Sequence, residues 1–234
     1  MGSYGVLMKK YEIHVHTKYS ACSLLKPATA LRILKRKGYN GVAITDHNTI
    51  KGALEARKLN KDKNFEVIVG EEIRSFLPNG GYCHVLGYYL KKEIKPGNIF
   101  DVIRQINSQG GVACIAHPFT AIRRAGIDMK SLGQLKGKIA GIECFNARNL
   151  FSKMDDKAAD ATKKFNFAAI AGSDAHFCFE LGQSATKFDD SLSLREALKK
   201  RKTISVKGTR LFAYAGHFMS MFVRKIKTFN LKLS

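Results

Sequence analysis

The sequence predicts an α/β protein whose strands close into a βα-barrel. Short apolar runs typical of buried strands alternate with amphipathic segments typical of helices along most of the 234 residues. His47, Glu72, His117 and Asp174 each come just after a predicted strand, and βα-barrels build their active sites at the carboxyl ends of the strands. An open sheet would spread these residues along a line. Only a closed ring brings the first strand close to Asp174.

The first half of the chain begins this alternation. Strands are predicted at residues 12–16, 41–45, 66–69 and 82–90, and helices at residues 27–37, 49–59 and 98–108. Pro27 suits the first turn of a helix, and Gly38 suits a helix end. Asn48 or Thr49 would cap the second helix, because short polar side chains accept hydrogen bonds from the first free N–H groups.

The first strand carries a pair of histidines. Side chains alternate along a strand, so His14 and His16 point to the same face. Neutral imidazole is the commonest metal ligand, and the pair would make half of a metal site. The alternative is a pair of surface or core histidines.

The second half continues the pattern and ends in a segment of different character. Strands are predicted at residues 112–116, 139–144, 167–171 and 203–206, and helices at residues 129–135, 152–165 and 192–201, with Ser152 as a cap. Residues 211–223 contain no formal charge, and a basic run follows at 224–227. We expect this segment to pack across the barrel bottom or to contact a second copy, with an interfacial membrane helix as the alternative. The predicted division is an extension or tag at 1–8, a barrel at 9–208 and a basic, apolar helical segment at 209–234.

The composition indicates a globular protein without a membrane span. It is 45% hydrophobic and 25% charged, and no apolar run reaches the roughly 18 residues that a span requires. Neither a secretory signal nor a Cys-x-x-Cys spacing is found, so the five cysteines are expected to be reduced thiols of a cytoplasmic protein. The oligomeric state is left open.

The net charge of +21 indicates a polyanionic or phosphorylated partner. Residues 195–234 contribute eleven Lys or Arg and one Glu, a net charge of +10. The candidate partners are a phosphorylated small molecule, a nucleotide or a nucleic acid. The alternative is a basic surface that serves only solubility.

Histidines and carboxylates form the candidate metal site. The candidate ligands are His14, His16, His47, Glu72, His84, His117, Asp174 and His176. Burying so many ionisable groups without a metal would be costly. Imidazole with carboxylate favours Zn, Mn or Fe over Mg or Ca, and paired ions about 3.5–4 Å apart are a usual device for hydrolysing phosphate esters.

Five motifs resemble those of the polymerase and histidinol phosphatase (PHP) family. They are His14-x-His16 with Thr17-x-x-Ser20, Thr45-Asp46-His47-Asn48, Gly70-x-Glu72, Ala116-His117-Pro118 and Gly172-Ser173-Asp174-Ala175-His176. The similarity covers roughly residues 9–190 and is strongest to stand-alone archaeal and bacterial members. It implies a distorted (β/α)7, TIM-like barrel with a di- or trinuclear metal centre.

The resemblance also implies roles for the ligands. The first metal would be held by His14, His16, Glu72 and Asp174, and Glu72 would bridge to a second metal held by His84 and His117. His47 and His176 would hold a third metal or contact the phosphate. The family often has Asp or His just after the Thr-x-x-Ser motif, where this chain has Ala21 and Cys22. Two or three divalent ions are therefore expected.

Other residues are expected to support the ligands and the substrate. Asp46 would orient a ligand imidazole, and Glu143 would act behind the ligands. Lys18 and Arg148 are the candidate phosphate contacts.

The predicted activity is that of a metal-dependent phosphoesterase. A metal-bridging hydroxide would attack phosphorus, with Asp174, His176, His47 and Glu72 as the catalytic set. The substrate would be a nucleotide, an oligonucleotide or a small phosphomonoester. The alternatives are a single-strand-specific exonuclease on RNA or DNA and a non-catalytic, metal-containing module that binds nucleic acid.

Overall fold

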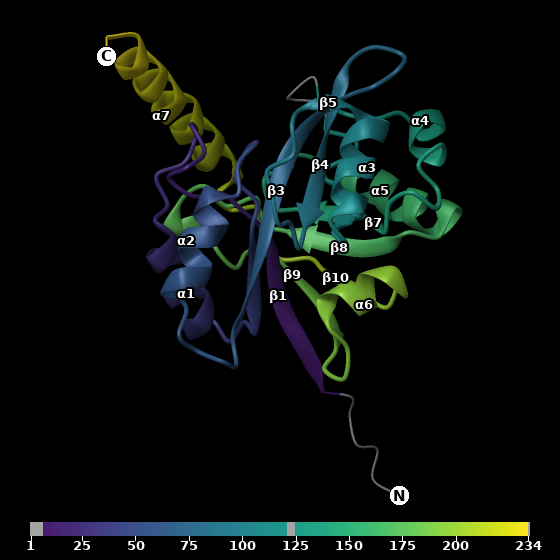
Figure 1. The fold of residues 1–234 in the computed structure, drawn as a ribbon, viewed down its shortest axis with the longest axis horizontal. Coiled ribbons are helices and arrows are strands. Elements are labelled where there is room, and N and C mark those ends of the chain that lie inside the picture. The colour runs from purple at the N-terminus through teal and green to yellow at the C-terminus, as the bar shows by residue number, and fades with distance from the viewer. Residues whose placement is uncertain (1–6, 121–124, 234) are drawn as a thin grey trace, which may run out of the picture.

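A single curved sheet organises the protein in the computed structural model, which describes residues 7–120 and 125–233 (Figure 1). Within these residues the strands are β1 (Met8–Val15), β2 (Gly41–Ile44), β3 (Glu66–Phe76), β4 (Tyr82–Tyr88), β5 (Gly97–Asn98), β6 (Val112–Ile115), β7 (Gly141–Asn146), β8 (Ala168–Gly172), β9 (Ala185–Asp189) and β10 (Ile204–Val206). Their order is β10-β9-β1-β2-β3-β4-β6-β7-β8, with β5 paired to β3. The predicted N-terminal extension lies outside the described residues, except for residues 7 and 8.

The β8 end of the sheet comes round to β1 and β9 and nearly closes the barrel. Val15 at the end of β1 forms a bridge with Ala175 beyond β8, and the N–H of His16 donates to the carbonyl of Ala175 at 2.8 Å. The Thr186 hydroxyl on β9 accepts from the N–H of Ala171 at 2.9 Å and donates to the carbonyl of Ala171 at 3.0 Å. These contacts bring β8 beside β1 and β9, and the predicted barrel is confirmed.

Apolar side chains fill the space among the strands. A buried cluster draws members from strands around the whole ring, namely Ile13, Ala43, Ile68, Leu86, Cys114, Ile170 and Phe188. A larger cluster packs the helices against the outside of the sheet. The interior is therefore a packed core, as in other βα-barrels.

Strand β4 departs from the predicted parallel alternation. It is antiparallel to both β3 and β6, and β9 is antiparallel to β1 and β10. A short turn around residues 78–81 joins β3 to β4, and such a turn can only join antiparallel strands. The predicted end of the third strand at residue 69 is also wrong. Strand β3 pairs with β2 up to Val69 and continues against β4 to Phe76, so Glu72 lies within a strand.

The helices occupy the predicted places, but their caps differ. They are α1 (Pro27–Arg36), α2 (Lys51–Leu59), α3 (Ile99–Ser108), α4 (Met129–Gly133), α5 (Ser152–Phe165), α6 (Leu194–Lys199) and α7 (Ala213–Leu233), with a 3-10 turn at Cys178–Glu180. Ile50 precedes α2 and Phe151 precedes α5, and neither side chain caps its helix. The predicted cap Asn48 instead accepts from the N–H of Arg74 at 3.2 Å, because β3 extends past it.

Helix α7 lies at the carboxyl rim of the barrel, so the predicted position at the barrel bottom is wrong. The Lys227 ammonium donates to the carbonyls of Lys18, Ser20 and Ser23 at 2.8–3.0 Å, and these carbonyls follow β1. Figure 1 shows the far end of α7 projecting away from the barrel. None of the described helices combines the length and the apolar character that crossing a membrane requires.

Candidate metal centre

His14 and His16 lie side by side at the carboxyl end of β1. Both are fully buried, and their Nε2 atoms are 3.2 Å apart. The Nδ1 of His14 is 3.0 Å from Glu143 Oε1, and the Nδ1 of His16 is 3.2 Å from Ser20 Oγ. An imidazole whose Nδ1 is engaged in this way presents its Nε2 lone pair as a metal ligand. The Nε2 lone pairs of His14 and His16 are therefore both available to a metal ion placed between them.

Glu72 connects imidazoles from four different segments. Its Oε2 lies 2.9 Å from His47 Nδ1 and 3.2 Å from His16 Nε2, and its Oε1 lies 3.1 Å from His84 Nδ1 and 3.0 Å from His117 Nε2. Burial opposes ionisation, but the neighbouring imidazoles hold the pKa of Glu72 well below its usual range. Glu72 is therefore a carboxylate at the hub of the cluster.

The spacing of these atoms fits a bound divalent cation. Glu72 Oε2 and His84 Nδ1 are buried, yet neither forms a hydrogen bond of acceptable geometry with the described residues. Buried polar atoms without such a bond are costly. Donor atoms around a tetrahedral ion with bonds of about 2.0–2.1 Å lie roughly 3.3 Å apart, close to the separations around Glu72. A metal ion would satisfy both atoms at once.

Three overlapping groups of ligands are present. The first is His14, His16 and Glu72; the second is Glu72, His84 and His117; the third is His16, His47 and His176. In each group, one ligand atom per residue lies within 4.8 Å of the others. Glu72 offers one oxygen to each of the first two groups. Imidazole and carboxylate together suit divalent transition metals.

Strained backbone turns two of these side chains toward the cluster. Asp174 has φ of +54° and His117 has φ of +26°, values that non-glycine residues rarely adopt. The Oδ1 of Asp174 lies 3.2 Å from His16 Nε2 and 3.7 Å from His14 Nε2. Each such conformation costs of order 1–3 kcal/mol and is typical of functional sites.

Glu143 fixes ligands from two strands. Its Oε1 lies 3.0 Å from the Nδ1 of His14, and its Oε2 accepts from the N–H of His117 at 2.8 Å. The Asn146 amide donates to the same Oε2 at 2.9 Å. Glu143 thus acts behind the ligands, where the sequence placed it.

Asp46 orients His16 through Ser20. One carboxylate oxygen of Asp46 accepts from the Ser20 hydroxyl and from the N–H of Thr17, and the other accepts from the Thr17 hydroxyl, all at 2.6 Å. The Ser20 hydroxyl in turn lies beside His16 Nδ1. The Thr-x-x-Ser motif therefore couples the aspartate to a ligand imidazole.

Arg148 joins His176 to α7. Its side chain is buried, with a terminal nitrogen 2.5 Å from His176 Nδ1 and the other donating to Ser220 at 3.0 Å. Its Nε is 3.3 Å from Glu180 Oε1. Burial, with the charge of Arg148, lowers the pKa of His176 well below its usual value. His176 is therefore neutral, the form that binds metal.

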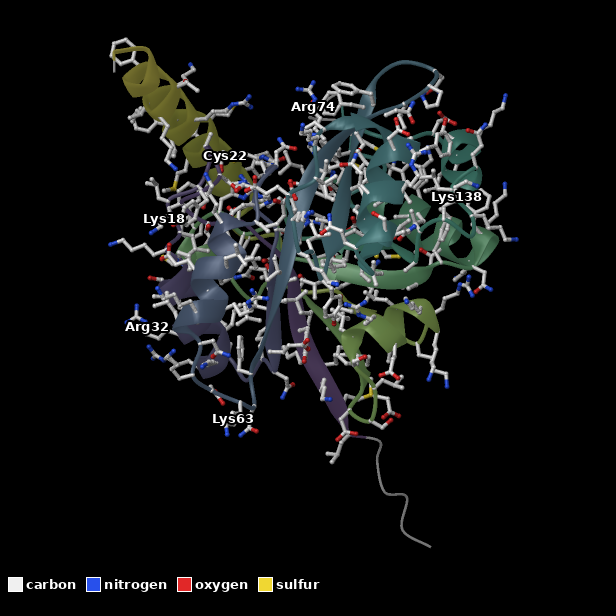
Figure 2. The ribbon with its side chains drawn as sticks, in the orientation of Figure 1. Lys18, Cys22, Arg32, Lys63, Arg74 and Lys138 are labelled. Atoms are coloured by element: carbon white, nitrogen blue, oxygen red, sulfur yellow. The ribbon has the colours of Figure 1, made fainter. Side chains whose placement is uncertain are left out.

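A pocket of about 640 Å³ opens above the third ligand group. Its lining includes His47, His84, His176, Cys22, Arg74, Tyr82 and Arg148, together with His217, Ser220, Met221 and Arg224 of α7. Lys18 is not part of this lining. Its side chain is 43% exposed and pairs with Glu55 of α2 at 2.9 Å, and Figure 2 shows Lys18 on the side of the molecule where α2 lies.

The residues that α7 contributes were missed in the sequence. His217, Ser220 and Arg224 lie more than 40 residues beyond the last motif, and no local pattern links them to the site. Arg74, a weaker candidate in the sequence than Lys18 and Arg148, also lines the pocket. It stands two residues after Glu72 on β3, a spacing that would have suggested the same side of the barrel.

Replacing Gly172 with Ala is expected to weaken metal binding about 10- to 100-fold. A Cβ at this position would collide with Glu143 Oε1 and His14 Cβ, and residues that orient metal ligands carry effects of this size. Metal content after dialysis against a graded chelator measures the change. Gly97→Ala is the matched control, because its Cβ would meet only a carbonyl at 3.9 Å. Equal metal retention in both variants would contradict the assignment.

Several known proteins are similar to this chain in sequence or in fold. A family model described as PHP domain matches residues 12–93, and one described as PHP-associated matches residues 155–203. An uncharacterized protein of Methanocaldococcus jannaschii is 36% identical over 151 residues, which are 59% of this chain and 82% of that protein. A 5'-3' exoribonuclease of Haemophilus influenzae is 33% identical over 86 residues, which are 37% of this chain and 31% of that enzyme.

A solved structure extends the likeness to nearly the whole fold. A two-domain protein of Bacteroides vulgatus, described as containing a predicted PHP-like metal-dependent phosphoesterase, superposes with a TM-score of 0.72 at 20% identity. The match covers 93% of this chain and 71% of that one. At this identity the likeness establishes the fold alone.

Proposed function

The chain belongs to the PHP domain family, and from this premise we propose that it is a metal-dependent phosphoesterase acting on a nucleotide or short oligonucleotide. The observation that carries the proposal is the cluster of seven candidate ligands, with Asp174 in contact with two of them, beside a pocket that three arginines line. The match to the PHP domain model and the relative described as a 5'-3' exoribonuclease support the reaction class.

The ligands of this chain would hold two or three divalent ions, with Zn, Mn or Fe as the candidates. Bound ions would polarise the phosphate and lower the pKa of an attacking water. The carboxylates of Glu72 and Asp174 would balance the charge of the ions. His47 and His176 stand at the pocket side of the cluster, where they are placed to contact either an ion or the phosphate.

Arginines supply the charge that recognises the phosphate. Arg148 and Arg224 both line the pocket, and guanidinium groups match phosphate oxygens in pairs of hydrogen bonds. Arg148 is held in place by Glu180 and Ser220, so little conformational entropy is lost when it binds. Lys18, predicted as a phosphate contact, is engaged with Glu55 and has no part in the proposed site.

Aromatic side chains favour a substrate that carries a base. Tyr19 and Tyr82 line the pocket, and Arg74 stacks on the Tyr82 ring at 4.0 Å from its centre. Stacking of a base on an aromatic side chain contributes roughly 1–3 kcal/mol. A small phosphomonoester without a base would leave these rings unused.

The alternative is a single-strand-specific exonuclease. The net charge of +21 and the partial likeness to an exoribonuclease favour it.

Two measurements test the function. Hydrolysis is assayed on a panel of mononucleotides, dinucleotides and single-stranded RNA and DNA, and the metal content of the protein is determined by elemental analysis. Affinity for single strands that falls steeply with salt supports the exonuclease, and a flat response supports the nucleotide. Metal occupancy without turnover on any ester would refute both and indicate a binding module.

Replacing Arg224 with Gln is expected to raise KM for a nucleotide phosphoester about tenfold, with a smaller change in kcat. A charge-assisted hydrogen bond contributes about 1.5–3 kcal/mol, and the exposure of Arg224 places its effect at the lower end. Steady-state kinetics measures the change. Lys225→Gln removes the same charge from the next residue, which is outside the pocket lining, and should leave KM unchanged. Equal effects of the two variants would indicate general electrostatics instead.

A further inference from the structure

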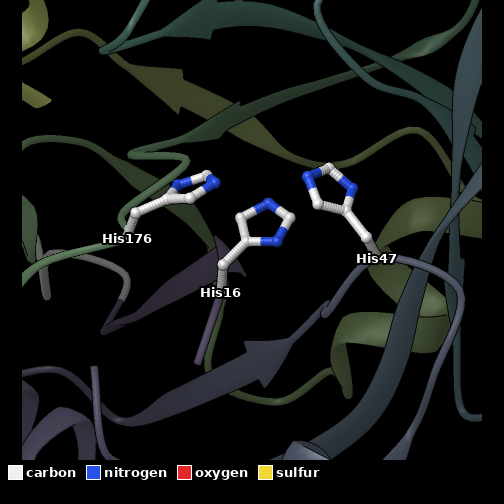
Figure 3. A group of neighbouring side chains, drawn as sticks. All are labelled: His16, His47 and His176. Atoms are coloured by element: carbon white, nitrogen blue, oxygen red, sulfur yellow. The ribbon is translucent and has the colours of Figure 1, made fainter. Parts of the chain in front are cut away.

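The third ligand group has only two ligands that it does not share with another group. It consists of His16, His47 and His176, and Figure 3 shows the three imidazoles gathered with His16 in the middle. The ring centres of His47 and His176 lie 4.4 and 4.2 Å from that of His16. Three protein ligands are the usual minimum for a bound zinc-like ion.

His16 is already committed to another group. Its Nε2 lies 3.2 Å from His14 Nε2, from Glu72 Oε2 and from Asp174 Oδ1, and its Nδ1 faces the Ser20 hydroxyl. A neutral imidazole has one lone pair for a metal. An ion between His47 and His176 therefore needs a donor from elsewhere.

Cys22 stands where that donor is needed. Its Sγ lies 3.1 Å from His176 Nε2 and also forms a hydrogen bond with the His47 side chain. The carbonyl of Asp174 lies 2.7 Å from the other ring nitrogen of His176. The same nitrogen also lies 2.5 Å from a terminal nitrogen of Arg148, so it is engaged within the protein and Nε2 is the ring nitrogen that faces the sulfur. Cys22 is one of the residues that line the pocket, so the position is open to solvent and substrate.

We propose that the Cys22 thiolate, His47 and His176 together bind a divalent metal ion at the mouth of the pocket. The thiol proton is released to solvent when the sulfur binds. Thiolate is a softer donor than carboxylate, so this position selects Zn, Co or Fe over Mg or Mn. The sulfur takes the place of the carboxylate or imidazole that the resemblance to other PHP domains leads one to expect near Ala21.

Cobalt spectroscopy tests the site independently of any enzymatic activity. The full chain is freed of metal and titrated with Co²⁺, whose bonds to thiolate give an intense charge-transfer absorption in the near ultraviolet. The wild type should show this band, and Cys22→Ser should lose it together with one bound Co²⁺ per chain. Cys22→Asp should recover the lost ion without the band, because a carboxylate also binds the metal. Recovery of the ion in Cys22→Asp also excludes misfolding as the cause of its loss.

The exposed thiol of Cys178 provides the matched control. Cys178→Ser should keep the band and the full cobalt content. A wild type without the band, or a band that survives in Cys22→Ser, would overturn the proposal. A band that disappears only in Cys178→Ser would assign the sulfur ligand to the wrong cysteine and overturn it equally.

Discussion

Replacing Glu72 with Gln is expected to remove metal binding and phosphoester hydrolysis together. The Glu72 carboxylate lies 2.9–3.2 Å from ring nitrogens of His16, His47, His84 and His117. An amide of the same shape keeps the packing but loses the negative charge that holds the ions. Metals contribute several kcal/mol to catalysis, and about 1.4 kcal/mol corresponds to tenfold in rate. The rate should fall by about three orders of magnitude.

The neighbouring Glu71 offers a close control for this substitution. It lies on the same strand but points to the opposite face, where it accepts from the N–H of Ile94 at 3.0 Å. Burial raises the pKa of Glu71 to about 8, so it is mostly neutral at pH 7 and resembles Gln. Glu71→Gln should therefore keep both metal and activity. Metal content is measured on both variants by elemental analysis, and activity by hydrolysis of a nucleotide phosphoester. Loss of metal and activity in both variants would indicate a structural effect and contradict the role of Glu72.

Replacing Asp174 with Ala is the second change with a large expected effect. The carboxylate lies 3.2 Å from His16 Nε2, and its loss removes the only donor that the last motif directs at the first ligand group. We expect depleted metal and a rate lowered at least about 1000-fold, since several kcal/mol of metal stabilisation are again at stake. Alanine is also disfavoured at the φ of +54° that Asp174 adopts, which adds about 1 kcal/mol of strain.

Asn166→Ala separates the strain from the lost charge. Asn166 has φ of +58° at the end of α5 and makes no contact with the ligand groups among the described residues. It should lose a similar amount of stability in thermal unfolding and yet retain metal and activity. An Asp174→Ala protein with normal metal content and an unchanged rate would refute the proposed centre.

Local pattern was sufficient to predict that the candidate ligands lie close together. Alternation along a strand placed His14 and His16 on one side, and the ends of successive strands supplied His47, His117 and Asp174. These features depend on residues that are close in sequence, or on the general rule that barrels build sites at one rim.

Local pattern failed where distant segments decide the structure. The third strand was ended at residue 69 because its change of partner from β2 to β4 depends on a hairpin that closes farther along the chain. Asn48 and Ser152 have side chains suited to helix caps, but Asn48 accepts a hydrogen bond from the N–H of Arg74 on β3, and Ser152 is already the first residue within α5. Helix α7 was assigned to the wrong end of the barrel, since the carbonyls that bind Lys227 belong to residues more than 200 positions away.

The sequence by itself determined the alternation of strands and helices, the eight candidate ligands and their order around a ring. Only the tertiary structure decided which candidate ligands lie together, that α7 lines the pocket, that Lys18 pairs with Glu55, and that Cys22 lies beside His176. The spacing of apolar and polar residues describes one strand or helix at a time, because it depends only on neighbours along the chain. Contacts between donor atoms depend on ångström-scale distances between elements, and these are fixed only when the whole barrel packs.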